Sequence, residues 1–347
     1  MEFTPDYTNI VDAAFNRISK RLPLYEHLIS DRTMGIILNS DFSDLKNGGY
    51  GDKVEYFRNY CEFYRQMGYD SVSFECCIGG AMPNSGCLGA HKESVLHTYD
   101  DFKKYPWDEI PDRFFNIYDD YYKALGEAMP AGMKAVGGVG NGVFECVQDI
   151  TGYTNLCYIS VDDPEMYAGL YRKTGEVSLK IWQRFLERYG DIYCVLRFGD
   201  DLGFKSNSLI SAEHIRRHVV PAYAKIIECV HGYGKPFLYH SCGCIFNVME
   251  DMINTAKIDA KHSNEDLIGE FQVWVDLYGD RIANFGGIDT DALCRLSIPE
   301  IKEYIIDLLS RCGSKGIAFS TGNSIPDYVP IDKYLAMIQT VREFRIE

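Results

Sequence analysis

The sequence lacks the short motifs that identify the commonest enzyme sites. It contains no G-x-x-x-x-G-K-[ST] phosphate loop, no G-x-S-x-G nucleophile elbow, no H-E-x-x-H zinc helix and no C-x-x-C redox pair. The glycine-rich segment at 137–143, GGVGNGV, is not the G-x-G-x-x-G dinucleotide fingerprint, and close backbone approach around a substrate is the better interpretation. These absences argue against the common nucleotide-binding, hydrolase, metalloprotease and dithiol chemistries.

The sequence also has little positive charge and no long apolar run. Its 35 Lys and Arg residues face 50 Asp and Glu residues, which gives a formal net charge of −15. Nucleic acids and anionic membranes are therefore poor partners. No apolar run reaches the ~18 residues that cross a bilayer, and the N-terminus has no apolar signal core. We expect a cytoplasmic protein whose 12 scattered cysteines are mostly buried thiols.

No linker or repeat divides the chain. We predict a single domain over 1–347, with 1–21 as an N-terminal helical extension. Short apolar runs without a polar face alternate with helical stretches, which is typical of parallel strands buried on both sides. Eight such runs predict an α/β fold of the (β/α)8 TIM-barrel type rather than an open doubly wound sheet. The runs are 22–28, 71–77, 134–140, 193–199, 236–242, 258–264, 281–287 and 316–322.

The helical stretches carry recognisable ends. Asp163 is a predicted N-cap, and Ser297 with Glu300 predicts a capping box. Pro221 is predicted to kink or split its helix. The stretch 34–39 is interpreted as a helix, with a strand as the alternative.

Polar side chains gather where the predicted strands end. In a (β/α)8 barrel the chemistry lies at the carboxyl ends of the strands, so these residues are expected to meet at the barrel mouth. They are Glu26, His27, Glu75, Cys76, Cys77, Asn141, Glu145, Asp200, Asp201, His240, Cys242, His262, Asn264, Glu265, Asp289, Thr321 and Asn323.

The stretch FLYHSCGCIF at 237–246 carries an imidazole and two thiols. His240 and Cys242 are two residues apart, so both side chains point to the same side of a strand. Imidazole nitrogen with thiolate sulfur is a zinc donor set, and a catalytic zinc takes three protein ligands and keeps one open position. Packing in a core strand is the alternative. Gly243 is expected to turn the chain, so Cys244 is interpreted as a loop cysteine.

Three carboxylates extend this candidate site. Glu75 is expected to face the mouth, as a ligand or a proton handler, because facing apolar helices unpaired would be costly. Asp200 and Asp201 are adjacent and therefore point in different directions. They fit either an acid–base site or a turn followed by a helix cap.

The sequence resembles the uroporphyrinogen decarboxylase superfamily over nearly its whole length, which implies a (β/α)8 barrel. The most specific pieces are H-x-C-G, D-D-L-G and GGID. The similar stretches are DAAFNRISKRLPLYEHLIS, FRNYCEFYRQMGYDSVSFE, FGDDLGFKSNSLISAEHIRRHVVPAYAKII, KPFLYHSCGCI, GDRIANFGGIDTDALCRLSIPEIKEYI and STGNSIPDYVPIDKYLAMIQTVREF.

Two branches of this superfamily differ in their motifs. The decarboxylases carry an arginine pair, R-x-x-x-R, after strand 1, and the corresponding YEHLISDR lacks it. The zinc-dependent, corrinoid-linked methyltransferases take His and Cys from H-x-C and a second Cys from the strand-8 loop. His240 and Cys242 match that motif, whereas Asn323 stands at the position of the second cysteine.

The resemblance to the second branch implies a function. Replacing a thiolate by oxygen makes a zinc site harder and suits an oxygen-bearing substrate, and Glu75 is the first choice for the missing ligand. The pattern is similar to the first methyltransferase of aryl-ether O-demethylase systems, which moves a methyl group from a methoxylated aromatic to cob(I)alamin on a separate corrinoid protein.

The implied roles of the remaining residues follow from that reaction. Asp200, Asp201 and Glu145 are predicted to act in catalysis, and Asn323, Glu26 and Asn141 to contact substrate. Alternative functions are methyl transfer from methanol, a methylamine or a methylthiol, a metal-free decarboxylase, and a non-enzymatic corrinoid or tetrapyrrole binder.

Overall fold

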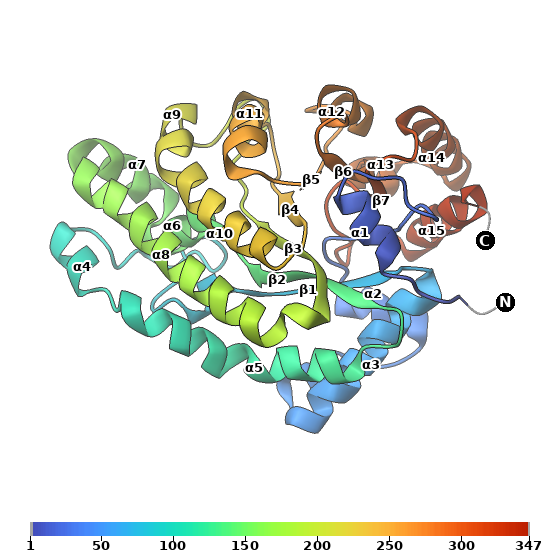
Figure 1. The fold of residues 1–347 in the computed structure, drawn as a ribbon, viewed down its shortest axis with the longest axis horizontal. Helices are drawn as coiled ribbons and strands as arrows, with labels where there is room; N and C mark the ends of the chain where they lie inside the picture. The colour runs from blue at the N-terminus through green and yellow to red at the C-terminus, as the bar shows by residue number, and fades with distance from the viewer. Residues whose placement is uncertain (1–2, 346–347) are drawn as a thin grey trace.

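Seven parallel strands form one curled sheet in the computed structural model, which describes residues 3–345 (Figure 1). The strands pair strictly in sequence order, so each β-α unit adds the next strand of the barrel. This confirms the predicted α/β TIM-barrel class. The strands are β1 (Ser71–Cys77), β2 (Lys134–Gly140), β3 (Tyr193–Gly199), β4 (Phe237–His240), β5 (Ala260–His262), β6 (Ala283–Ile288) and β7 (Ile317–Thr321).

The prediction of a regular strand at 22–28, the first of the eight, is wrong. This segment lies beside β7 through an isolated parallel bridge at Leu24. Pro23 has no backbone N–H to donate, which limits a continuous ladder. Toward β1 the contact is made by a side chain, because the Ser73 hydroxyl donates to the His27 carbonyl at 2.8 Å. The segment therefore lies between β7 and β1 without continuing the sheet.

Helices cover the outer side of the sheet (Figure 1). The α-helices are α1 (Thr8–Ala14), α2 (Asp31–Leu38), α3 (Tyr50–Met67), α4 (Tyr99–Lys104), α5 (Ile110–Ala128), α6 (Val143–Thr151), α7 (Tyr153–Asp162), α8 (Pro164–Tyr189), α9 (Ala212–His214), α10 (Val220–Gly232), α11 (Met249–Asp251), α12 (Phe271–Tyr278), α13 (Thr290–Arg295), α14 (Ile298–Cys312) and α15 (Ile331–Phe344). Short 3-10 or π-helical turns are η1 (Ser43–Asn47), η2 (Ile78–Ala81), η3 (Trp107–Glu109), η4 (Gly190–Ile192), η5 (Ile215–Val219), η6 (Phe246–Val248) and η7 (Met252–Ala256).

The predicted helix ends are confirmed. Asp163 accepts from the Met166 N–H at 2.9 Å, and Ser297 forms the capping box that opens α14. Just before Pro221 the helix widens into the π-helical turn η5, so the predicted disturbance is a change of helix type. The stretch 34–39 is helical, as part of α2.

Helix α1 packs on the inner residues of the barrel. Its buried Ile10, Ala13 and Ala14 share a cluster with small and branched side chains from β2 to β7, including Val136 and Ala260. Helix α1 thus supplies the helical part of the predicted N-terminal extension and packs beside β6 and β7 (Figure 1). Polar groups concentrate instead at the carboxyl ends of the strands.

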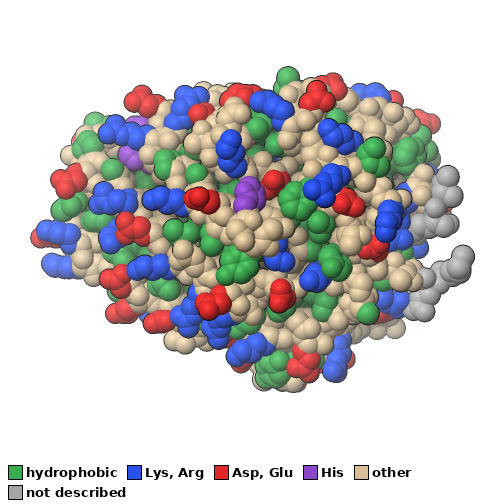
Figure 2. Space-filling model, in the orientation of Figure 1, with side chains coloured by type: hydrophobic (Ala, Val, Ile, Leu, Met, Phe, Trp, Pro, Cys, Tyr) green, Lys and Arg blue, Asp and Glu red, His purple; other side chains and the backbone are tan. Residues whose placement is uncertain are grey.

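Charges of both signs are interspersed over the face shown in Figure 2. Blue Lys and Arg side chains alternate with red Asp and Glu side chains, and neither sign forms a continuous field there. Among residues 3–345, no helix combines the length and hydropathy needed to cross a membrane.

Candidate metal centre at the barrel mouth

His240 and Cys242 meet at the carboxyl end of β4. The Cys242 Sγ lies 3.4 Å from the His240 Nε2. One nitrogen and one sulfur ligand of a tetrahedral zinc stand about 3.5 Å apart, given bond lengths of about 2.0 and 2.3 Å. The two atoms therefore already have the separation that a shared zinc ion requires.

Asp201 completes a three-donor group with this pair. Its Oδ1 lies 3.8 Å from the His240 Nε2 and accepts the Cys242 backbone N–H at 2.8 Å. Strands β3 and β4 are paired so that Gly199 lies opposite His240. Asp201 and Cys242 each follow two residues later, and they therefore lie side by side just beyond the ends of these strands. The ligand atoms of the three residues all lie within 4.8 Å of one another. One nitrogen, one sulfur and one oxygen donor fit a catalytic zinc site with an open fourth position.

The sulfur of Cys242 receives polar contacts from two further residues. The Asn323 amide donates to the Sγ at 3.2 Å, and the Ser263 hydroxyl donates at 3.8 Å. Burial, together with the Asp201 carboxylate, raises the pKa of the Cys242 thiol. The Asn323 and Ser263 donors are nevertheless suited to a thiolate, which is the form of cysteine that binds a metal.

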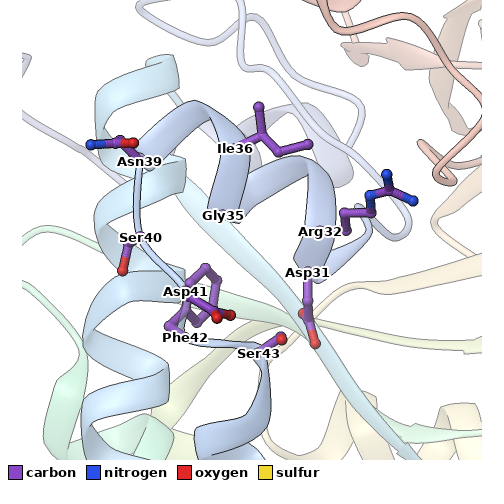
Figure 3. A pocket seen from close by; sticks show the side chains of 9 residues that line it. All are labelled: Asp31, Arg32, Gly35, Ile36, Asn39, Ser40, Asp41, Phe42 and Ser43. Carbon is purple, nitrogen blue, oxygen red and sulfur yellow. The ribbon is translucent and has the colours of Figure 1, made fainter.

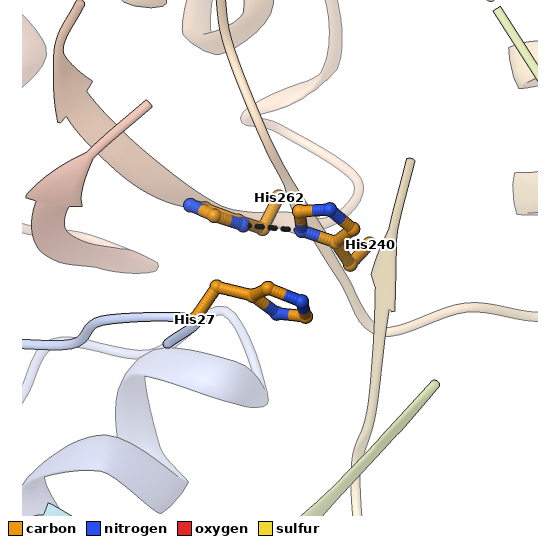
Figure 4. A group of neighbouring side chains, drawn as sticks. All are labelled: His27, His240 and His262. Carbon is orange, nitrogen blue, oxygen red and sulfur yellow. Dashed lines mark hydrogen bonds between the residues drawn. The ribbon is translucent and has the colours of Figure 1, made fainter. Parts of the chain in front are cut away.

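Three histidines pack together behind this group (Figure 4). His27 stacks on His240 with ring centroids 3.8 Å apart and planes at 11°, and the His240 Nδ1 lies 2.7 Å from the His262 Nδ1. Two nitrogen ligands of one tetrahedral zinc stand about 3.3 Å apart, so the Nδ1 pair is too close to share an ion. It is a hydrogen bond, and the metal-facing atom of His240 is its Nε2.

Glu75 lies apart from this group, in an ion pair with Arg197. The guanidinium donates to the Glu75 Oε2 from Nε at 3.0 Å and from Nη2 at 2.8 Å. Arg197 is buried inside the barrel, where it also donates to Tyr25 and Ser73. Glu75 is not in either candidate metal group among the described residues. Its carboxylate is held by the arginine instead.

Asp200 turns away from Asp201, as adjacent residues do. Its carboxylate accepts the Phe144 and Glu145 backbone N–H groups at 2.9 and 2.7 Å, at the first turn of α6, and a hydrogen bond from the Tyr223 hydroxyl. Burial raises the pKa of Asp200 to about 7. Asp200 thus caps α6, which precedes it in the chain, rather than a helix that follows it, and its role in catalysis stays a prediction. Asp201 is the member of the pair that faces Cys242.

Glu145 and Asn141 lie on the flank of the donor group. The Asn141 amide donates to the Glu145 Oε2 at 3.0 Å, and the other carboxyl oxygen lies 3.4 Å from the Asp201 backbone nitrogen. Burial, with the Asp200 and Asp201 carboxylates, raises the pKa of Glu145 well above its usual range. Asn141 also accepts from the Gly79 N–H, which ties the loops after β1 and β2 together.

Glu26 is buried and bonded to β7. Its carboxylate accepts from the Thr321 backbone N–H at 3.0 Å and from the Thr321 hydroxyl at 2.7 Å. Burial raises the pKa of Glu26 to about 8. These contacts join the segment 22–28 to the barrel. The substrate contact of Glu26 stays a prediction.

The Glu26→Gln variant tests this structural role. The folded protein binds the Glu26 proton more tightly than the unfolded chain, so this group's contribution to stability is complete below about pH 4.5 and falls as pH rises to about 8. A neutral glutamine can accept the Thr321 N–H through its amide oxygen and donate its NH2 group to the Thr321 hydroxyl, without that loss. Relative to wild type, we expect the variant's free energy of unfolding in urea to rise by about 4 kcal/mol between pH 5 and pH 9. An unchanged difference across that range would contradict the assignment.

Gly243 allows the loops after β3 and β4 to touch. Its φ is +78°, and a Cβ there would lie 2.3 Å from the Gly203 carbonyl carbon. Next to it, Phe204 and Cys244 form an antiparallel bridge. The predicted turn at Gly243 is thus part of the contact that brings Asp201 and Cys242 together.

The Gly243→Ala variant is expected to separate these loops. We predict a loss of more than about 3 kcal/mol in the free energy of unfolding, together with weaker zinc binding. Gly234→Ala is the matched control, because Gly234 also has a positive φ of +67° but its Cβ would meet no atom within 4 Å. An equal loss of unfolding free energy in the two variants would show that the positive φ alone, and not the contact between the loops, causes the destabilisation.

An aromatic cavity of about 370 Å³ lies beside His27. Tyr56, Tyr60 and Tyr121 supply its aromatic wall, together with Phe74. Two ion pairs, Arg197–Glu75 and Lys46–Asp31, line it as well, so its charges balance. A one-ring neutral ligand with polar substituents matches this volume and lining.

A larger hollow, of about 700 Å³, lies along one face of α2 and the segment that follows this helix (Figure 3). Its lining contains no histidine or cysteine, so it lacks the donors of the candidate metal centre. Figure 3 shows Asp31, Asp41 and Ser43 near one another at one end. The lining residues are Asp31, Arg32, Gly35, Ile36, Asn39, Ser40, Asp41, Phe42 and Ser43.

Sequence reasoning gave no role to three residues of the site. His27 and His262 were expected at strand ends, but nothing in the sequence showed that they flank His240. Arg197 was missed, although a cation inside the apolar run YCVLRFG signals a buried partner. Its partner is Glu75.

Comparisons with known proteins agree with this architecture. A solved methyltransferase from Methanosarcina mazei matches with a TM-score of 0.73 and 15% identity over 99% of each chain. A structure described as the putative vitamin-B12 independent methionine synthase from Listeria monocytogenes matches with a TM-score of 0.51 and 12% identity, covering 94% of this chain and 100% of the other. At these identities the likeness concerns the fold. No curated protein matches the sequence. The family model described as uroporphyrinogen decarboxylase (URO-D) matches residues 63–344, so the chain belongs to this family.

Proposed function

We propose that this protein is a zinc-dependent methyltransferase in which His240, Cys242 and Asp201 hold the metal. The observation that carries the proposal is the three-donor group at the barrel mouth, with nitrogen and sulfur 3.4 Å apart. Asp201 replaces Glu75 as the proposed oxygen ligand, because Glu75 is engaged by Arg197. Asn323 serves as a hydrogen-bond donor to the cysteine sulfur, and its predicted substrate contact remains part of the proposal.

The proposed methyl donor is a methoxylated aromatic compound. The cavity beside His27 would take its ring against Tyr56, Tyr60 and Tyr121. When bound, zinc supplies a Lewis acid that stabilises negative charge on the leaving oxygen. A hard oxygen ligand in place of a second thiolate suits such a substrate.

The proposed acceptor is cob(I)alamin carried by a separate corrinoid protein. The methyl carbon–oxygen bond breaks, a cobalt–carbon bond forms, and the leaving oxygen keeps the electron pair until it is protonated. Glu145 is the proposed proton donor, since its carboxyl group lies against the Asp201 backbone and Asn141 orients it. The partner would approach the carboxyl ends of the strands, where the donor group lies.

A cationic amine is the second candidate donor. A cavity of about 380 Å³ reaches Asn323 and is lined by Glu265, Asp289 and Asp291, with the exposed ring of Tyr328. Carboxylates and an aromatic face both favour an ammonium group. A methylamine is therefore included in the test beside the aromatic ethers.

The test uses the zinc-loaded protein, chemically reduced cob(I)alamin and a panel of methyl donors. We expect methylcobalamin, detected by visible absorbance, with methoxybenzoates or methoxyphenols and not with methanol or methanethiol. Formation from trimethylamine alone would favour the second candidate. Absence of methylcobalamin with every donor, and release of carbon dioxide from a carboxylated tetrapyrrole, would support the decarboxylase alternative instead.

A further inference from the structure

The Nδ1 of His240, the ring nitrogen that does not face Cys242, is hydrogen-bonded to His262. The His240 Nδ1 and the His262 Nδ1 lie 2.7 Å apart, and both rings are buried at the ends of the neighbouring strands β4 and β5 (Figure 4). A hydrogen bond between two imidazoles requires one donor and one acceptor. Which ring donates decides which nitrogen of His240 keeps a free lone pair.

The other nitrogen of His262 settles the direction of this bond. The His262 Nε2 lies 3.1 Å from the Thr321 backbone carbonyl, which can only accept. The Ser320 hydroxyl donates to the same carbonyl, so its oxygen, 3.4 Å from the Nε2, is also available as an acceptor. The His262 Nε2 therefore carries a proton.

Both rings are neutral in this surrounding. Each Nδ1 is bonded to the other ring and neither to a carboxylate. The Asp201 Oδ1 lies 3.8 Å from the His240 Nε2, beyond hydrogen-bond distance, so an imidazolium buried here would be costly. With its proton on Nε2, neutral His262 offers a lone pair at Nδ1. His240 must then donate from its Nδ1, which leaves a lone pair on the Nε2 that faces the Cys242 Sγ at 3.4 Å.

We infer that His262 is a positioning residue that fixes His240 in the tautomer able to bind a metal through Nε2. His27 cannot replace it, because its ring lies flat on His240 and offers no acceptor in the plane of that ring. The metal-binding consequence rests on the proposed function, whereas the tautomer itself exists without metal. Such outer-shell partners orient histidine ligands and raise their basicity.

Two substitutions separate hydrogen bonding from packing. His262→Asn places an amide oxygen near the former Nδ1, where it can accept from His240. His262→Leu fills similar space without an acceptor. His231→Leu is the control for removing a histidine, since His231 pairs with Asp259 at the other end of β5.

The first readout uses zinc-free protein labelled with ¹⁵N-histidine. Long-range ¹H–¹⁵N spectra are expected to show the His240 proton on Nδ1 in wild type, His262→Asn and His231→Leu. In His262→Leu we expect it to move to Nε2 or to exchange between the two nitrogens. A proton on Nε2 in wild-type protein would overturn the inference, whatever the zinc affinity.

The second readout is the zinc dissociation constant, measured by competition with a chromophoric chelator. We expect zinc to bind 10–100-fold more weakly to His262→Leu, and within a few-fold of wild type to His262→Asn. Wild-type affinity in His262→Leu, or an equal loss in both variants, would contradict the positioning role. Failure of wild-type protein to bind zinc would instead reject the proposed function and leave the tautomer result standing.

Discussion

Replacing His240 with alanine is expected to abolish stable zinc binding and methyl transfer. The variant keeps Cys242 and Asp201 but loses the only nitrogen donor of the three-residue group. Because loss of an outer-shell partner already costs 10–100-fold in metal affinity, loss of a ligand should cost more than about 100-fold. Metal analysis after dialysis, and methylcobalamin formation, measure the two losses.

Two further variants make this result specific. Cys242→Ser preserves the size of the buried side chain and is expected to lose zinc as well, because a hydroxyl is a poor zinc ligand in proteins. His231→Ala, which removes the histidine that pairs with Asp259 before the start of β5, should bind zinc as wild type does. Full zinc occupancy and unchanged methyl transfer in His240→Ala would exclude the proposed centre, provided that the variant unfolds at the wild-type urea concentration.

Replacing Arg197 with methionine is expected to destabilise the protein by about 3–5 kcal/mol. Methionine fills much of the same space but leaves the Glu75 carboxylate without its buried partner. It also removes the donor to the Tyr25 hydroxyl, the Ser73 hydroxyl and the His27 carbonyl. Urea unfolding followed by circular dichroism measures the loss.

An exposed arginine provides the comparison. Arg184 pairs with Asp112 at 2.6 Å, but both side chains are solvent-exposed. Arg184→Met should therefore cost less than about 1 kcal/mol. The double variant Arg197→Met with Glu75→Gln is expected to recover part of the loss, since no unpaired charge remains. A loss for Arg197→Met as small as that for Arg184→Met would mean that this network does not stabilise the barrel.

The architecture was accessible from the sequence because buried parallel strands and capped helices leave local signals. The runs that form β1 to β7 are apolar without a polar face, and Asp163 and Ser297 stand at real helix starts. The segment 22–28 has the same apolar character. Whether it completes a ladder depends on backbone pairing with both neighbours, which an apolar pattern does not encode.

The proposed third ligand could not be chosen from the sequence, because the choice depends on strand register. Glu75 lies near the end of one apolar run, and Asp201 follows another. Only the pairing of Gly199 with His240 brings the chain after β3 beside Cys242. Glu75 lies on β1, which is separated from β4 by two strands, and it faces Arg197.

The contact between His262 and His240 also could not be predicted from the sequence. His240 and His262 are opposite each other in the β4–β5 register, but they are 22 residues apart in a chain with eight histidines. H-x-C is a local pattern, since it needs only the two-residue repeat of a strand. A partner on the next strand has no fixed spacing, because the connecting helix sets the distance along the chain.

Zinc K-edge X-ray absorption on the purified, zinc-loaded protein tests the central claim most directly. Bond lengths and scattering distinguish sulfur from nitrogen and oxygen ligands. A centre built from His240, Cys242 and Asp201 predicts one sulfur at about 2.3 Å and nitrogen or oxygen ligands at about 2.0 Å, with the sulfur contribution lost in Cys242→Ser. Two sulfur ligands, or none, would contradict this donor set.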